Sequence, residues 1–168
     1  AVADFPDARF ALGTELFASG HFDEAADQLQ QIIQPHPARA DRLPARLLLG
    51  HVFLAEGRLR AAAGQFDGLL ESDPSNRAAR DGLAAVGAAN RDLAASLMRQ
   101  GHGAEAAARA REAVRLAPAD PAARNLLGVA LASEGRLDEA VAQFQEALRV
   151  DPNDQQAQIK ALSEISGL

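Results

Sequence analysis

The chain has 168 residues, of which 48% are hydrophobic and 24% charged, and its formal net charge at pH 7 is −6. This length and apolar content exclude a mainly disordered chain and suffice for one domain with a hydrophobic core. The acidic balance, 23 acidic against 17 basic residues, argues against binding to a nucleic-acid backbone. Cysteine is absent, which excludes disulfides, thiolate metal sites and a cysteine nucleophile.

The composition favours helices over strands. Alanine alone accounts for 39 residues, whereas the β-branched Val, Ile and Thr together number 12. Aromatic residues make up only 4% of the chain, and all seven are Phe. Strong helix formers with small or aliphatic side chains therefore have to build the interior, and we predict an all-α fold.

A spaced pattern of small residues occurs four times along the chain. Stepping by seven, five, four, three and five residues from Gly13 gives a set that recurs from Gly50, from Ala94 and from Gly128. The four sets are Gly13, Gly20, Ala25, Leu29, Ile32 and Pro37; Gly50, Gly57, Ala62, Phe66, Leu69 and Pro74; Ala94, Gly101, Ala106, Ala110, Ala113 and Pro118; and Gly128, Gly135, Ala140, Phe144, Ala147 and Pro152. Such a pattern predicts repeated structural units.

Each position of the pattern has a structural role. The second glycine ends a first amphipathic helix in a left-handed conformation. Asp23 and Asp138 follow that turn and are expected to cap a second helix, which the proline then ends. The first small residue lets the two helices approach closely, so each copy is a helical hairpin that must stack on its neighbours.

This pattern resembles the tetratricopeptide repeat (TPR) family, and residues 135–154, GRLDEAVAQFQEALRVDPND, are close to its second half. The resemblance implies a right-handed α-α superhelix of four hairpins, over about 6–39, 43–76, 87–120 and 121–154, and a C-terminal capping helix at about 154–166. We expect a single domain, 1–168. The family's usual Trp is replaced by Arg9, Arg46, Asn90 and Arg124, and its usual Tyr by Leu16, Phe53, Leu97 and Leu131. Arginine stems can cover apolar surface, so the fold survives the change.

An insert of ten residues, 77–86, separates the second and third repeats. Leu83, Val86, Asn90, Leu93 and Leu97 recur every three or four residues without an intervening proline. The insert is therefore expected to extend the next helix to about 25 residues. Gly82 and Gly87 weaken this interpretation, and two shorter helices with a kink are the alternative.

The sequence predicts no catalytic residue, cofactor or metal site. The four histidines, His21, His36, His51 and His102, lack ligand spacing. His21, His36 and His102 fall at turns of the repeat pattern and are expected to be solvated loop residues. Acidic pairs such as Asp23 and Glu24 lie at helix starts, where they complement the helix dipole. No hydrolase, phosphate-binding or dinucleotide motif occurs in a fitting context.

The remaining candidate site is a surface. In the family that the chain resembles, the first helices of successive repeats line a concave groove that binds a peptide or a partner helix. The corresponding positions here are mostly apolar, which is typical of an interaction site. They are Phe10, Thr14, Phe17, Leu47, His51, Leu54, Arg91, Met98, Asn125 and Val129.

We therefore expect a non-catalytic, bacterial-type scaffold that binds a protein or peptide, with no nucleic acid partner and no membrane insertion. One alternative is a TPR module of a larger enzyme or of a secretion or assembly machine, which the Ala1 start permits. A second alternative is self-association into homo-oligomers. The sequence predicts a soluble protein and leaves the cytoplasm and the periplasm open as its location.

Overall fold

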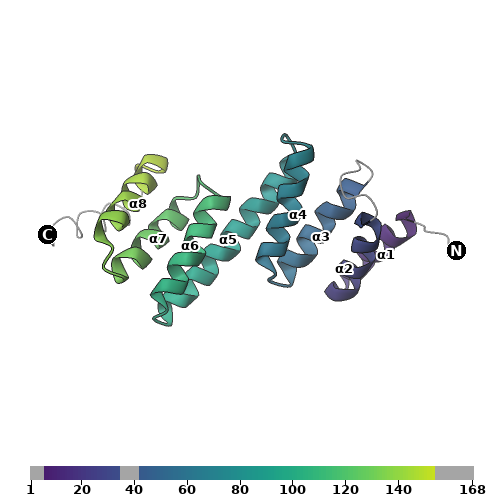
Figure 1. Ribbon diagram of the computed structural model, residues 1–168, viewed down its shortest axis with the longest axis horizontal. Helices are drawn as coiled ribbons and strands as arrows, with labels where there is room; N and C mark the ends of the chain where they lie inside the picture. Colours follow the sequence, from purple (N-terminus) through teal and green to yellow (C-terminus); the bar gives the residue numbers. More distant parts are fainter. Residues whose placement is uncertain (1–5, 35–41, 154–168) are drawn as a thin grey trace. The chain divides into compact units, whose positions relative to one another are not determined.

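The computed structural model describes residues 6–34 and 42–153 (Figure 1). The elements in these ranges are helices, which confirms the all-α prediction. They are α1 (Pro6–Ala18), α2 (Phe22–Ile33), α3 (Leu43–Ala55), α4 (Leu59–Ser72), α5 (Arg77–Arg99), α6 (Gly103–Leu116), α7 (Pro121–Ser133) and α8 (Leu137–Val150). The expected capping helix at about 154–166 lies outside the described residues, as does Pro37.

The chain divides into two units, residues 1–83 and 84–168. In the first unit α1 packs on α2, α2 on α3, and α3 on α4. In the second unit α6 packs on α7 and α7 on α8. Each unit thus has the order expected of stacked hairpins, in which a helix is buried by its own partner and by the next repeat.

Four glycines end the first helices in the left-handed conformation that the sequence predicted. Their φ angles are +81° at Gly20, +73° at Gly57, +81° at Gly101 and +76° at Gly135. At Gly57 the backbone N–H donates to the carbonyl of Leu54, and the next N–H reaches back to Phe53. Residues with a Cβ are strained in this conformation, so the repeat uses glycine at this turn.

The expected capping by Asp23 and Asp138 is wrong. The N-caps of α2 and α8 are His21 and Arg136, and neither makes a side-chain capping bond. The two aspartates lie two positions after these N-caps, in the first turn of each helix. There a carboxylate acts on the helix dipole instead of accepting a capping hydrogen bond.

The first glycine of a repeat leaves room for a large side chain of the second helix. A Cβ at Gly50 would lie 2.5 Å from the ring of Phe66, and a Cβ at Gly128 would lie 2.5 Å from the ring of Phe144. Phe66 also meets a second glycine, because a Cβ at Gly82 would lie 2.6 Å from the same ring. The fully buried ring of Phe66 is therefore held between a glycine of α3 and a glycine of α5.

The insert 77–86 forms the first part of α5, a single helix of 23 residues. Ala79 and Val86 of this segment are both fully buried. The insert therefore supplies core side chains in addition to length.

Two of the arginines that replace the family's tryptophan contact the second helix of their own hairpin. The guanidinium of Arg46 lies against Gly68 of α4, in the space that a side chain there would take. In the first hairpin Arg9 donates a hydrogen bond of 3.1 Å to the side chain of Gln28. Long polar side chains thus join the two helices where the usual repeat has an aromatic ring.

Candidate functional site

Six of the predicted site residues lie in the first unit. Phe10, Thr14 and Phe17 recur at helical spacing on α1, and Leu47, His51 and Leu54 do so on α3. We call these six residues the α1–α3 face. The two helices contact each other directly, so the structure brings both halves of the face into one unit.

The apolar side chains of the α1–α3 face are only half-buried. This holds for Phe10, Phe17, Leu47 and Leu54. By contrast, Leu49 on the other side of α3 is 2% exposed, since it packs into the hairpin stack. The fold therefore covers the core side of α3 and leaves part of this face accessible.

The polar groups of the α1–α3 face have contacts within the protein. The Thr14 hydroxyl donates to the Phe10 carbonyl at 2.8 Å, so its oxygen remains an acceptor. The ring of His51 meets the ring of Phe66 edge-on, with centroids 5.2 Å apart. Phe17 packs on Phe22 of α2 at 5.8 Å. These contacts fix the orientation of three of the six side chains.

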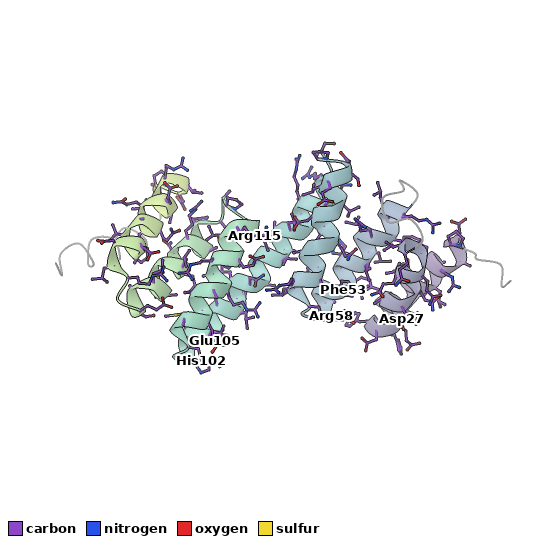
Figure 2. All side chains as sticks on the ribbon, in the orientation of Figure 1. Asp27, Phe53, Arg58, His102, Glu105 and Arg115 are labelled. Atoms are coloured by element: carbon purple, nitrogen blue, oxygen red, sulfur yellow. The ribbon has the colours of Figure 1, made fainter. Side chains whose placement is uncertain are left out.

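Arg58 lies next to α3 but does not add a free charge to this unit. Its guanidinium stacks over the ring of Phe53, 4.2 Å from the centroid (Figure 2), and pairs with Glu56 at 3.0 Å. The stacking is a cation–π contact that holds the turn after α3 against the helix.

The other four predicted residues lie in the second unit, and two of them have structural contacts. Arg91 of α5 donates to Asp120 at 2.6 Å, and Asp120 also accepts from the N–H groups of Ala122 and Ala123 as the N-cap of α7. Partial burial acts to lower the pKa of Arg91, but the charge and hydrogen bond of Asp120 outweigh it and raise that pKa. Asn125 of α7 is buried, with 8% of its surface exposed. Both residues therefore contribute to packing between helices.

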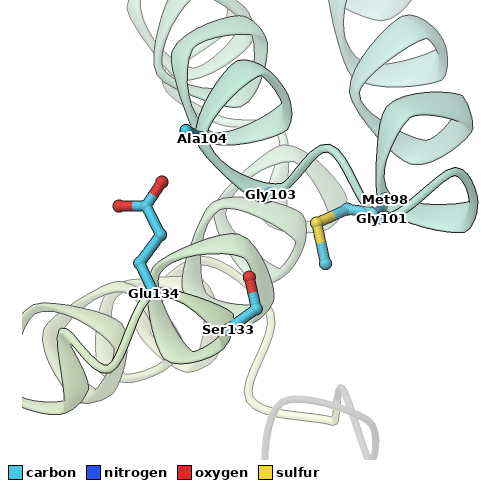
Figure 3. Close-up of a pocket in the computed structure, with 6 residues that line it drawn as sticks. All are labelled: Met98, Gly101, Gly103, Ala104, Ser133 and Glu134. Atoms are coloured by element: carbon cyan, nitrogen blue, oxygen red, sulfur yellow. The ribbon is translucent and has the colours of Figure 1, made fainter.

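Met98 and Val129 remain half-exposed, and Met98 borders a pocket that the sequence did not predict. The pocket has a volume of about 370 Å³ and lies between the start of α6 and the end of α7 (Figure 3). Its lining residues are Met98, Gly101, Gly103, Ala104, Ser133 and Glu134. A Cβ at Gly103 would lie 2.8 Å from the Ser133 hydroxyl oxygen, so this glycine keeps the wall open.

Within the described ranges, no group of three His, Asp or Glu side chains is placed to hold a metal ion. His102 is exposed and contacts Glu105 at 3.2 Å (Figure 2), and His21 contacts the Ser19 hydroxyl at 3.1 Å. His36 lies outside the described residues. None of the helices in the part of the chain that the structure covers combines the length and apolar character needed to cross a bilayer.

The solved structures with similar folds include structures of TPR proteins. The MamA protein aligns with a TM-score of 0.51 and 17% identity, over 96% of this chain and 81% of that chain. TTC0263, a thermophilic TPR protein of Thermus thermophilus, aligns with a TM-score of 0.45 and 20% identity, over 96% of this chain and 100% of that chain. The first TPR of Spaghetti (RPAP3), bound to an HSP90 peptide, aligns with a TM-score of 0.47 and 18% identity, over 77% of this chain and 94% of that chain. No curated protein sequence matches the chain.

Two family models, both described as tetratricopeptide repeat, match residues 16–86 and 91–155. Together these ranges span most of the chain, from the end of α1 to the end of α8. The turn glycines, together with Gly50 against Phe66 and Gly128 against Phe144, occupy the positions that the repeat pattern assigns to them. The chain therefore belongs to the tetratricopeptide repeat family.

Proposed function

We propose that the protein is a non-catalytic scaffold that binds a peptide or helix of a partner protein on the α1–α3 face. The observation that carries the proposal is the partial exposure of Phe10, Phe17, Leu47 and Leu54 on two helices in contact. The core positions of the hairpins are filled by other side chains, such as Leu29 and Leu49. A bound segment removes this apolar area from water, which favours association.

The face favours an apolar partner segment over an acidic one. Its six residues include no Lys or Arg, so no cation is placed there to hold a carboxylate. The Thr14 oxygen and the His51 ring are the polar groups that remain to meet a partner's backbone. In the second unit we propose the equivalent positions Arg91, Met98, Asn125 and Val129, among which Met98 and Val129 are the more accessible side chains.

The test compares partner capture with stability. The double variant Phe17→Ser and Leu54→Ser should lose the partners that the immobilised wild type retains from lysate, because a lost anchor costs about 1 to 3 kcal/mol of binding. Its melting temperature should stay near that of the wild type. Leu12→Ser is the matched control, since Leu12 lies on another side of α1 and is 49% exposed. This control should retain capture.

Two outcomes contradict the proposal. Full capture by the stable double variant places the binding surface elsewhere, and a large loss of stability assigns Phe17 and Leu54 to the core. Mass spectrometry of the proteins retained by the wild type and the control, but lost with the double variant, then identifies the partner.

A further inference from the structure

The pocket next to Met98 has an apolar wall and an acidic edge. Figure 3 shows the Met98 side chain extending toward Ser133, and the Glu134 carboxylate extending from the end of α7 on the side of Ala104. Gly101 and Gly103 add no side chains to the wall. A volume of about 370 Å³ is at the small end of the range for ligand sites, so the pocket fits one extended side chain better than a large cofactor.

The polar side-chain atoms that line the pocket are acceptors. The Ser133 hydroxyl donates its hydrogen to the Ala130 carbonyl at 2.7 Å, so its oxygen faces the pocket only with lone pairs. Glu134 receives one hydrogen bond, from Arg136 to Oε2 at 3.2 Å, and no donor in the described ranges reaches its Oε1. Arg136 is held more closely by Glu139, at 2.6 and 2.7 Å. An occupant that reaches these two side chains therefore has to bring hydrogen-bond donors.

The charge balance decides between a neutral and a cationic donor. Glu134 is the one charged residue among the six that line the pocket. Gly103 and Ala104 begin α6, whose N-terminus carries a partial positive charge of about 0.5. Glu134 lies at the C-cap of α7, which carries a partial negative charge of about the same size. The two helix ends offset each other. Glu134 pairs with Arg136, which pairs more closely with Glu139, so these three side chains leave one net negative charge beside the pocket, and this charge favours a cation.

We propose that this pocket binds a lysine or arginine side chain of the partner protein, with its aliphatic stem against Met98 and Ala104 and its cationic head on Glu134 and Ser133. Lysine and arginine combine such a stem with such a head. The inference rests on the proposed function only in assigning the side chain to a protein partner. It adds a basic residue to the features expected of the partner protein.

Met98 provides a direct test because it is the only methionine in the chain. Protein labelled with ¹³C in the methionine methyl group gives one NMR signal from the pocket wall. Titration with N-acetyl-arginine methylamide and with N-acetyl-lysine methylamide should shift this signal saturably. The neutral probe N-acetyl-norleucine methylamide, which has a similar stem and no charge, should bind at least tenfold more weakly.

Two variants separate the pocket charge from the general charge of the unit. Glu134→Gln should weaken binding of the cationic probes at least tenfold. Glu105→Gln removes an equal charge from an exposed residue outside the lining, and should change that affinity less than twofold. The absence of a shift with both cationic probes, equal binding of norleucine, or unchanged binding to Glu134→Gln overturns the inference.

The probe experiment fails separately from the proposed function. A negative titration beside a Phe17→Ser and Leu54→Ser variant that loses its partner rejects the pocket and keeps the α1–α3 face. A positive titration together with full partner capture by that variant keeps the pocket and rejects the α1–α3 face.

Discussion

Gly50→Ala tests whether the first glycine of the repeat is required for helix contact. The new Cβ would lie 2.5 Å from Cε1 of Phe66, whereas ordinary contacts of this kind begin near 3.4 Å. The ring would have to move by about 0.9 Å. It has little freedom to do so, since it is fully buried and Gly82 meets it closely as well.

The expected loss of stability follows from two opposing effects. Overpacking a core costs about 1 to 3 kcal/mol, and the two glycines around Phe66 place this site near the upper limit. Replacing a helical glycine by alanine returns about 1 kcal/mol through helix propensity. A net destabilisation of about 2 kcal/mol should lower the melting temperature by about 4 to 8 °C.

Gly64→Ala is the matched control, because Gly64 lies inside α4 and a Cβ there meets no heavy atom within 4 Å. This substitution should stabilise the protein by about 0.5 to 1 kcal/mol. Thermal melts followed by circular dichroism compare the two. In a double-mutant cycle, Phe66→Leu should cost less in the Gly50→Ala background than in the wild type. The reasoning is refuted if Gly50→Ala melts as high as Gly64→Ala.

Three further outcomes follow from described contacts. Ala140→Glu places a charge at a fully buried position and should destabilise by about 3 kcal/mol or more in thermal melts. Asp120→Asn keeps the cap of α7 but loses the ion pair with Arg91, so its melting temperature should fall between those of the wild type and Asp120→Ala, which loses both. Hydrogen bonds from the Ser75 hydroxyl and N–H lower the pKa of Asp73. The ionised Asp73 side chain therefore stabilises the folded state at pH values above the ordinary carboxyl pKa, and this stabilisation is lost as the pH falls through the lowered pKa. An NMR titration of the wild type, compared with Asp73→Asn, identifies the titration step that belongs to Asp73.

The hairpins were predictable because their determinants are local and repeated. A glycine after an amphipathic stretch, such as Gly57 or Gly135, marks a left-handed turn whatever lies around it. The pairing of Gly50 with Phe66, and of Gly128 with Phe144, follows from constant spacing within one hairpin. The turn glycine and the glycine–phenylalanine pair both lie within a single repeat, so the sequence alone is sufficient to predict the hairpin.

Features that depend on a neighbouring element were not predictable. Gly82 was interpreted only as a weak point of a helix, whereas it makes room for a ring of the preceding hairpin. Glu134 and Ser133 border a pocket whose other wall comes from the start of α6, and no spacing rule connects those segments. The prediction of aspartate caps is wrong because the N-cap lies two residues before each aspartate, and the repeat spacing alone does not fix the residue at which a helix begins.

The alanine core of the second unit limits how its sequence can vary. Ala106, Ala107, Ala110 and Ala113 of α6 are all fully buried, and the first three share a core cluster with Ala94 and Ala130. An alanine loses no rotamer freedom on burial, so the contact between these helices, which we call the alanine seam, forms at little cost in side-chain entropy. Every larger side chain there overpacks the seam, and glycine weakens the helix. Substitutions that adapt this unit to new partners are therefore expected at its outward-facing positions, because a change of a buried alanine costs stability.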